Sequence, residues 1–268
     1  MLDHRKTAVL SLAMLLASSG GGEADTSIST RAWVSGGSPL LPDPSFTFPE
    51  SSSANLAGRA DVGIAFSGGG SRAFVSAAGE VRALRLLGLV GRIKYAASVS
   101  GGSWFNALWQ FWQSGAADEA ALLGPYVPPA ALNETFLRAM PEGCCLAAPG
   151  SESLWVALAR LLREAKDDPA YNLDRAWLDA THEIFLAPWG VSKDAYMSWN
   201  ESTVESIRAR NAGNERLQAA EFALPHSADL PFPLFAGTAV APADEPFLGK
   251  VPPCNRSYTV WQMNPLCE

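Results

Sequence analysis

Residues 61–74 have the sequence DVGIAFSGGGSRAF, in which a strand pattern, a glycine-rich turn and a helix pattern follow one another. The apolar run Val62–Phe66 is short and bounded by turn residues, as expected of a buried strand. Gly68–Gly70 form the turn. A helix is predicted from Ser71 to about Leu87, because apolar residues recur there at spacings of three and four. Gly88 is a natural C-terminal stop for it.

The same order of patterns occurs a second time. Ile93–Val99 predict a strand, Ser100–Gly102 a turn, and Ser103–Gln113 a helix that is apolar nearly all round and is therefore expected to be buried. A further core strand is predicted at Leu234–Val240. Two successive strand–turn–helix units predict an α/β fold with a parallel-rich central sheet flanked by helices.

The composition limits the classes of function. The chain has 268 residues, 48% of them apolar, and a formal net charge of −7. A sizeable core is therefore expected, nucleic-acid binding is disfavoured, and no general attraction to anionic membranes is gained. Nine tryptophans are many for this length; they either pack in the core or sit at a lipid interface. No pattern predicts a cofactor or a metal, and the oligomeric state stays open.

The N-terminus has the features of a secretory signal. In residues 1–24, a short charged region precedes the apolar run Thr7–Ala17, which is too short to span a bilayer of about 30 Å as a helix. A plain apolar N-terminal helix is the alternative. Residues 25–60 are rich in Ser, Pro and Gly and predict an irregular lead-in. The signal predicts a protein that is secreted or enters an endomembrane or vacuolar lumen.

Three N-x-[S/T] sequons agree with that localisation and predict a glycoprotein; they begin at Asn133, Asn200 and Asn255. The chain also has an even number of cysteines. An oxidising compartment would allow Cys144 or Cys145 to pair with one of the two later cysteines, Cys254 and Cys267. The spacing of the four does not resemble a zinc site.

The second turn has the pattern of a nucleophile elbow. A serine on a sharp strand-to-helix turn has an exposed hydroxyl at the positive end of a helix. The usual pattern is G-x-S-x-G; here Ser98 replaces the first glycine, Ser100 is the serine and Gly102 is the last glycine. Ser98 and Ser103 are rival nucleophiles, but only Ser100 occupies the predicted turn itself.

The first turn supplies what the elbow lacks. Acyl transfer builds negative charge on a carbonyl oxygen, and backbone N–H groups of residues without side chains can point at it. Gly68–Gly70 are such residues, and Gly101 is a possible further donor. Arg72 lies in the first helical turn, where a cation opposes the helix dipole, which suggests an external anion such as phosphate. A nucleotide-binding P-loop is excluded because no lysine follows the glycines.

Taken together, the two turns resemble the catalytic domain of cytosolic phospholipase A2 and of the fungal lysophospholipases, and more distantly patatin. The stretches GIAFSGGGSRA (63–73) and YAASVSGGSW (95–104) carry the resemblance, which covers about residues 61–112. It implies that residues 61–268 are the N-terminal part of such a domain.

The resemblance implies hydrolysis of fatty acyl esters of phospholipids or lysophospholipids at a membrane or micelle surface. It implies a Ser–Asp dyad with Ser100 as nucleophile and an acyl-enzyme on that residue. It further implies that Gly69 and Gly70 donate to the oxyanion and that Arg72 holds the substrate phosphate. No cofactor or metal is implied.

The sequence departs from the family pattern at the general base of the dyad. The family's aspartate lies in a D-x-G or D-G-[GA] turn, and no such turn follows Ser100. The chain is therefore expected to end before the second half of the catalytic domain. One alternative is a lipid-binding fragment that lacks the dyad aspartate, and another is a transacylase with the same nucleophile. A third is a triad with His182 or His226 as base.

Overall fold

The computed structural model forms two compact units, the first from residues 1–58, 194–225 and 264–268 and the second from residues 59–193 and 226–263. All the predicted site residues belong to the second unit. The structure describes residues 28–29, 37–38, 41–42, 47–113, 118–139, 144–147, 153–167, 171, 175–242 and 256–266. The predicted signal peptide, Asn255, Cys254 and Cys267 lie outside these residues.

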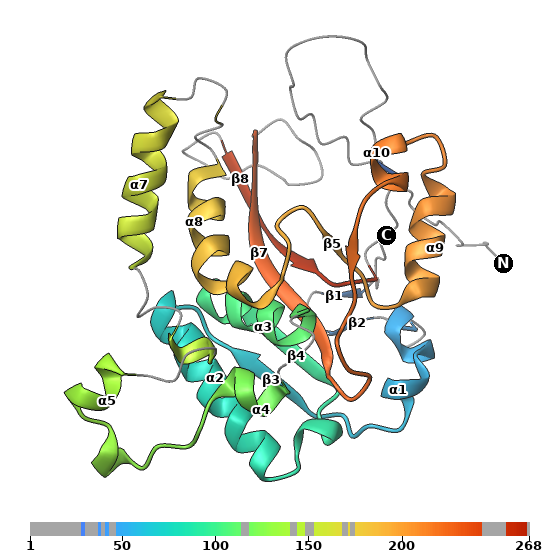
Figure 1. The fold of residues 1–268 in the computed structure, drawn as a ribbon. Coiled ribbons are helices and arrows are strands. Elements are labelled where there is room, and N and C mark those ends of the chain that lie inside the picture. The colour runs from blue at the N-terminus through green and yellow to red at the C-terminus, as the bar shows by residue number, and fades with distance from the viewer. Residues whose placement is uncertain are drawn as a thin grey trace, which may run out of the picture. The chain divides into compact units, whose positions relative to one another are not determined.

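The second unit is built on a four-stranded sheet in the order β3–β4–β7–β8 (Figure 1). Its strands are β3 (Gly63–Phe66), β4 (Tyr95–Val99), β7 (Phe232–Pro242) and β8 (Arg256–Met263). The first three are parallel, and β8 runs antiparallel to β7. The predicted α/β class with a parallel-rich sheet is thus confirmed, while the antiparallel strand β8 was not predicted.

Two helices follow the first two strands directly. They are α2 (Ser71–Leu86) and α3 (Gly101–Phe111), and α3 packs against β3, β4, β7 and α2. α2 ends as predicted, with Gly88 at φ 67° and the N–H of Leu89 donating to the carbonyl of Leu84, a glycine C-cap.

Helix α3 begins two residues earlier than predicted, because Ser100 itself is the N-cap. Strand β4 begins two residues later than predicted, at Tyr95, because the short 3₁₀ helix η2 (Val90–Arg92) precedes it and Ile93 is the C-cap of η2. These boundary shifts leave the predicted turn at Ser100 in place.

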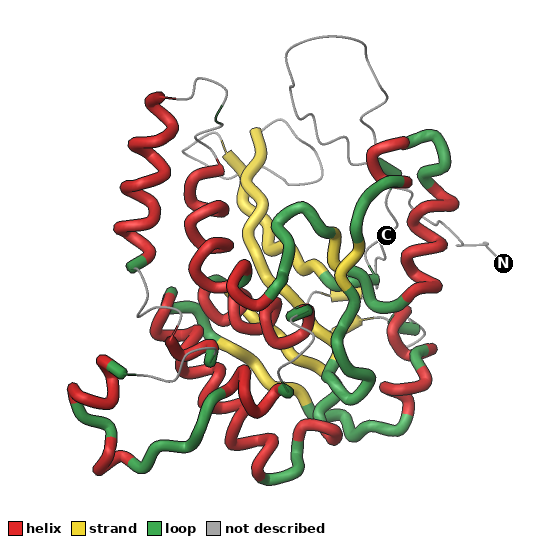
Figure 2. The backbone as a smooth tube through the Cα atoms, viewed as in Figure 1, coloured by secondary structure: helices red, strands yellow, loops and turns green. Residues whose placement is uncertain are grey.

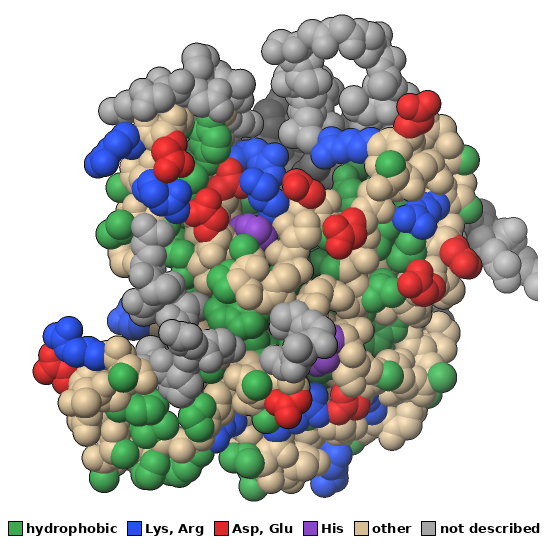
Figure 3. All heavy atoms as spheres, viewed as in Figure 1, with side chains coloured by type: hydrophobic (Ala, Val, Ile, Leu, Met, Phe, Trp, Pro, Cys, Tyr) green, Lys and Arg blue, Asp and Glu red, His purple; other side chains and the backbone are tan. Residues whose placement is uncertain are grey.

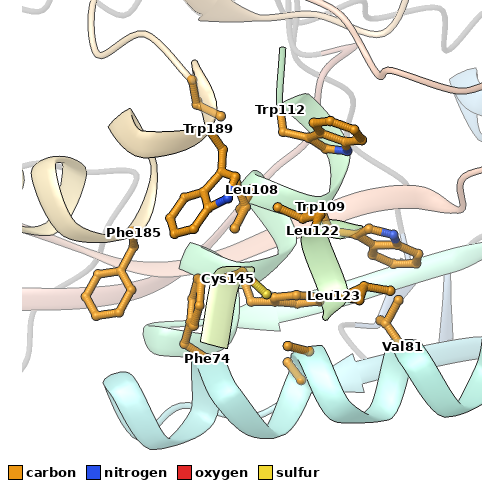
Figure 4. Packing of buried hydrophobic residues seen from close by; sticks show 14 of the residues in the cluster. Phe74, Val81, Leu108, Trp109, Trp112, Leu122, Leu123, Cys145, Phe185 and Trp189 are labelled. Atoms are coloured by element: carbon orange, nitrogen blue, oxygen red, sulfur yellow. The ribbon is translucent and has the colours of Figure 1, made fainter. Parts of the chain in front are cut away.

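Aromatic side chains fill the space between these helices. The ring centroids of Phe74 and Phe105 lie 5.7 Å apart and edge-on, and Phe105 packs on Phe66 of β3 at 5.7 Å. Helix α8 (Ala176–Phe185) packs against the same aromatic cluster, with the ring centroid of Phe185 4.8 Å from that of Phe74. Figure 4 shows side chains of α2, α3, α4 and α8 pointing toward one another in this core.

Most of the remaining elements are short, and Figure 2 distinguishes helices, strands and loops by colour. The second unit also contains α4 (Glu119–Leu123), η3 (Pro129–Ala131), α5 (Glu134–Arg138), η4 (Cys145–Ala147), α7 (Leu154–Asp167) and η6 (Ala187–Trp189). The first unit contains β1 (Gly37–Ser38), β2 (Leu41–Pro42), η1 (Pro49–Ser52), α1 (Ala54–Ala57), β5 (Tyr196–Met197), α9 (Glu201–Arg210), α10 (Glu215–Gln218) and β6 (Phe222–Ala223).

Two of the predicted sequons lie in this described part. Asn133 and Asn200 are both exposed, and each side-chain oxygen caps a helix by accepting a backbone N–H, from Phe136 and Thr203 respectively. Within the described ranges, no helix is both long and apolar enough to cross a bilayer.

Candidate active site

The two strand-to-helix turns lie side by side. Phe66 of β3 is in register with Ser98 of β4, and because the strands are parallel, the residues two positions further on also meet. A Cβ built on Gly68 would lie 3.2 Å from the Cβ and 3.8 Å from the Oγ of Ser100. The glycine run and the predicted nucleophile are therefore immediate neighbours at the carboxyl edge of the sheet, where sites form in parallel α/β folds.

Ser100 has an unusual backbone conformation. Its φ is 53° and its ψ is −127°, and it is the one non-glycine residue with positive φ in the described part of the chain. Such a conformation costs about 1–3 kcal/mol and persists only where the surroundings enforce it. Gly70, the N-cap of α2, has nearly the same conformation, with φ 63° and ψ −141°. Both turns thus make the same sharp bend from strand into helix.

The bend exposes the hydroxyl of Ser100. The residue is exposed, and within the described residues its Oγ has no hydrogen-bond partner. It precedes the eleven-residue helix α3, whose N-terminal partial positive charge favours an oxyanion at this position. The geometry suits an attacking hydroxyl.

Close packing dictates the two glycines after Ser100. A Cβ on Gly101 would lie 2.2 Å from the carbonyl oxygen of Gly70, and a Cβ on Gly102 would lie 2.6 Å from that of Ser67. Both contacts are with backbone, which cannot rotate away. The absence of side chains at these two positions is therefore a steric requirement of bringing the two turns together.

The two turns also contain backbone donors without partners. The N–H groups of Gly69, Gly70 and Gly101 have no hydrogen-bond acceptor among the described residues. Free N–H groups at the starts of two helices form an anion-binding environment. In acyl-transfer enzymes, removal of one such donor typically costs roughly 3–4 kcal/mol of transition-state stabilisation.

A polar network supports the elbow from behind. The fully buried Asn106 of α3 donates from Nδ2 to the carbonyl of Ala96 and to Oγ of Ser98, each at 3.0 Å. Ser103 Oγ donates to Ser98 Oγ at 3.2 Å, and Ser98 Oγ donates to the carbonyl of Leu234 in β7. The rival serines 98 and 103 are therefore both engaged in structural hydrogen bonds, unlike Ser100.

Asn106 was not singled out in the sequence, although a signal was present. Asn106 and Gln110 are polar residues one turn apart in a mostly apolar helix. Gln110 donates from Nε2 to the carbonyl of Pro231 at 3.0 Å. Polar side chains in a buried helix require partners, so the pattern indicates hydrogen bonds to neighbouring strands.

Replacing Asn106 with alanine is expected to destabilise the fold by about 2–4 kcal/mol, because two buried acceptors lose their donor and a cavity is left. The substitution Asn106→Asp at the same position is expected to destabilise the fold at least as much, because it buries a charge. Urea unfolding followed by circular dichroism measures both. An unchanged midpoint for Asn106→Ala would show that the network does not support the elbow.

Arg72 lies on the first turn of α2, where the sequence placed it. The side chain is exposed, and the described residues place no carboxylate within ion-pair distance of it. A cation left unpaired beside two helix N-termini leaves room for an external anion.

Neither candidate histidine forms a hydrogen bond with Ser100. His226 contacts the far end of α3: its Nδ1 lies 3.3 Å from the carbonyl of Gln110, and its Nε2 accepts from the indole of Trp112. Gln110 is nine residues after Gly101, which corresponds to about 14 Å along a helix. Burial lowers the pKa of His226. His182 Nε2 lies 2.7 Å from the carbonyl of Val191. The alternative of a histidine base is therefore not supported.

Three of the aspartates within the described ranges have structural roles. Asp118 caps α4, and Asp179 accepts from Tyr171 and Lys193. Burial raises the pKa of Asp229, but hydrogen bonds from Arg85 and Ser227 outweigh it and hold the pKa below its usual range. In the described part of the chain, no carboxylate contacts the hydroxyl of Ser100. The base expected of a Ser–Asp dyad is thus unassigned there.

Cys144 and Cys145 are free thiols and are buried. Burial raises the pKa of Cys145 to about 12, which disfavours its thiolate at neutral pH. Their predicted disulfide partners lie outside the described residues. No group of three His, Cys, Asp or Glu side chains in the described part could hold a metal ion.

Fold and geometry together define an α/β domain with a parallel-rich sheet that holds a serine in a strained strand-to-helix turn beside a glycine-rich turn. No family model matches the sequence, and no curated protein does. Among solved structures, the chain is similar to human GIVD cytosolic phospholipase A2, alone (TM-score 0.37) and with methyl gamma-linolenyl fluorophosphonate (TM-score 0.34), each at 19% identity. The alignments cover 76% of this chain and 22% of those structures. The chain therefore spans less than a quarter of their length, and function must be inferred from the site residues themselves.

Proposed function

We propose that this chain carries the nucleophile site of a serine-dependent hydrolase of fatty acyl esters, acting on phospholipids or lysophospholipids. One observation carries the proposal: Ser100 is held in a strained turn at the start of a buried helix, with free backbone donors of the neighbouring turn beside it. Strain concentrates at functional sites. A turn that served only to connect β4 to α3 would be more stable with glycine at this position.

In the proposed reaction, Ser100 Oγ attacks the ester carbonyl while its proton passes to a general base. The carbonyl oxygen becomes an oxyanion, which the N–H groups of Gly69 and Gly70 stabilise, with Gly101 as a further donor. The bond from the carbonyl carbon to the glycerol oxygen then breaks, and that oxygen leaves with a proton. Water attacks the acyl-enzyme, and the fatty acid and free Ser100 are released.

The base is proposed by resemblance rather than by geometry. It would be an aspartate of a D-x-G or D-G-[GA] turn, which the 268 residues do not contain after Ser100. Arg72 is proposed to hold the substrate phosphate. The localisation proposed from the sequence, secreted or in an endomembrane or vacuolar lumen, stays a prediction, as do the signal peptide and the glycans.

A lipid-binding chain without catalysis is the second candidate, favoured by the absence of a carboxylate beside Ser100 in the described residues. A transacylase would use the same residues and differ only in the acceptor. With labelled lysophospholipid as donor, transfer to added alcohol faster than release to water would favour transacylation.

A soluble fluorophosphonate probe tests the nucleophile directly. We expect covalent labelling at Ser100, because its hydroxyl is exposed and free while those of Ser98 and Ser103 are engaged. Peptide mapping by mass spectrometry identifies the labelled residue, and Ser103→Ala is the matched control that should retain labelling. Labelling at Ser98 or Ser103, or none in the native chain, would refute the assignment.

A further inference from the structure

Helices α7 and α8 expose two tryptophans that touch each other. Trp155 is 71% exposed and Trp177 is 44% exposed, and their ring centroids lie 5.8 Å apart. Their neighbours Val156 and Leu178 are 56% and 52% exposed. We call these four side chains the Trp face. Large exposed apolar side chains that contact one another are costly in water, so an exposed indole pair of this kind indicates a binding surface.

The rest of the helix pair explains why these side chains point outward. α7 buries Ala157 and Leu161, and α8 buries Ala180 and Ile184, so each helix already has a core-facing side. The tryptophans lie outside those sides. Their indole N–H groups have no acceptor among the described residues, which leaves them free for a polar partner. An apolar ring with a free polar edge is the side chain favoured at membrane–water interfaces.

A line of aromatic rings connects the Trp face to the candidate nucleophile. The ring of Trp177 lies 6.3 Å from that of Trp104, and Trp104 stacks on Phe185 at 4.9 Å. Trp104 is four residues after Ser100, in the first turn of α3. A lipid bound at the Trp face would therefore be near the start of the helix that carries the proposed oxyanion site.

The charges around the Trp face favour an anionic partner. Figure 3 shows basic, acidic and hydrophobic side chains together over α7 and α8. The described acidic side chains of the two helices are all paired, Glu164 and Glu183 with Arg160, and the buried Asp179 with Lys193. Arg163 and Arg175 are exposed, and no described carboxylate lies within ion-pair distance of either. Electrostatic interactions extend over about 8 Å at physiological salt. The unpaired arginines can therefore attract a nearby anion in spite of the net charge of −7.

We infer that the Trp face, together with Arg163 of α7 and Arg175 at the start of α8, seats the chain on a lipid surface that contains anionic phospholipid. Indole rings enter the interfacial layer and the guanidinium groups meet lipid phosphates. The inference rests on the proposed function, since it supplies the surface from which Ser100 would draw its substrate. The composition alone predicts no general attraction to anionic membranes, so the inferred binding depends on the local cations of α7 and α8.

Sedimentation with vesicles tests the inference. We expect Ser100→Ala, which cannot consume lipid, to bind vesicles of phosphatidylglycerol and phosphatidylcholine. Adding Trp155→Ala and Trp177→Ala should reduce partitioning by about tenfold or more, because interfacial binding scales with buried apolar area. Leu137→Ala, which removes an equally exposed apolar side chain on α5, is the matched control and should bind unchanged. Far-UV circular dichroism verifies folding.

A second pair of variants does not depend on the tryptophans. Arg163→Gln with Arg175→Gln should remove the preference for anionic over pure phosphatidylcholine vesicles and leave the fold intact, since both side chains are exposed. Equal partitioning of the native and tryptophan variants would overturn the inference. So would a native dimer that the tryptophan variants dissociate while vesicle binding stays the same, because the face would then bind a second copy.

These results are separable from the proposed function. Vesicle binding without fluorophosphonate labelling of Ser100 would refute the hydrolase and leave the lipid surface standing. Labelling of Ser100 with unchanged binding of the tryptophan variants would refute the lipid surface alone.

Discussion

Ser100→Ala is expected to slow release of fatty acid from lysophospholipid by at least about 10⁴-fold, in any preparation where the native chain releases it. Removing the nucleophile of a serine hydrolase typically costs this much or more, because the acyl-enzyme cannot form. Ser103→Ala is the matched control and should keep most of the activity. Ser100→Ala with native activity would rule out Ser100 as the nucleophile.

Replacing Ser100 with glycine, in contrast, is expected to stabilise the fold. Ser100 has φ 53°, a conformation that glycine adopts without strain. Ser100→Gly is therefore expected to raise the free energy of unfolding by about 1 kcal/mol, or the melting temperature by roughly 2–4 °C. Thermal unfolding followed by circular dichroism measures this. A lower melting temperature would mean that the serine side chain, not the backbone bend, stabilises the turn.

Gly101→Ala is expected to destabilise the fold by about 3 kcal/mol or more. Its Cβ would lie 2.2 Å from the carbonyl oxygen of Gly70, and 2.7 Å from the nitrogen of the same residue. Overpacking against backbone cannot be relieved by a rotamer change, so the two turns would have to separate. Urea unfolding gives the loss directly, and fluorophosphonate labelling of Ser100 should fall with it.

Gly79→Ala is the matched control for that substitution. Gly79 lies within α2, and a Cβ there would meet no atom within 4 Å outside the helix backbone. Alanine should therefore stabilise the helix by up to about 1 kcal/mol. If both variants unfolded at the same urea concentration, contact between the two turns would not be a source of stability.

Local sequence patterns were sufficient for the elements that position the site. The strand before Ser67, the helix from Ser71 to the stop at Gly88, and the turn at Ser100 follow from apolar periodicity and glycine placement within a few residues. The conformation of a sharp turn is also specified locally, which is why a G-x-S-x-G-like pattern was sufficient to locate the turn at Ser100. The boundary errors at β4 and α3 arose because a 3₁₀ helix and an N-cap have weak sequence signals.

Features that depend on distant contacts could not be predicted in this way. Ser98 completes its hydrogen bonding through the carbonyl of Leu234, 136 residues later in the chain. The engagement of His226 at the far end of α3 depends on where the chain returns to the core. The contact between Trp155 and Trp177 requires α7 and α8 to pack together, and periodicity alone does not specify which faces meet.

The pairing of β4 with β7 also bears on how the protein is made. β4 ends at Val99, whereas its partner β7 begins only at Phe232. A ribosome adding about 5–20 residues per second needs on the order of ten seconds to synthesise the intervening segment. During that interval the nascent chain has an unpaired, mostly apolar strand edge, which favours aggregation and the need for a chaperone. Parallel pairing across so long a loop is also intrinsically slow, so refolding from denaturant should lag behind helix formation.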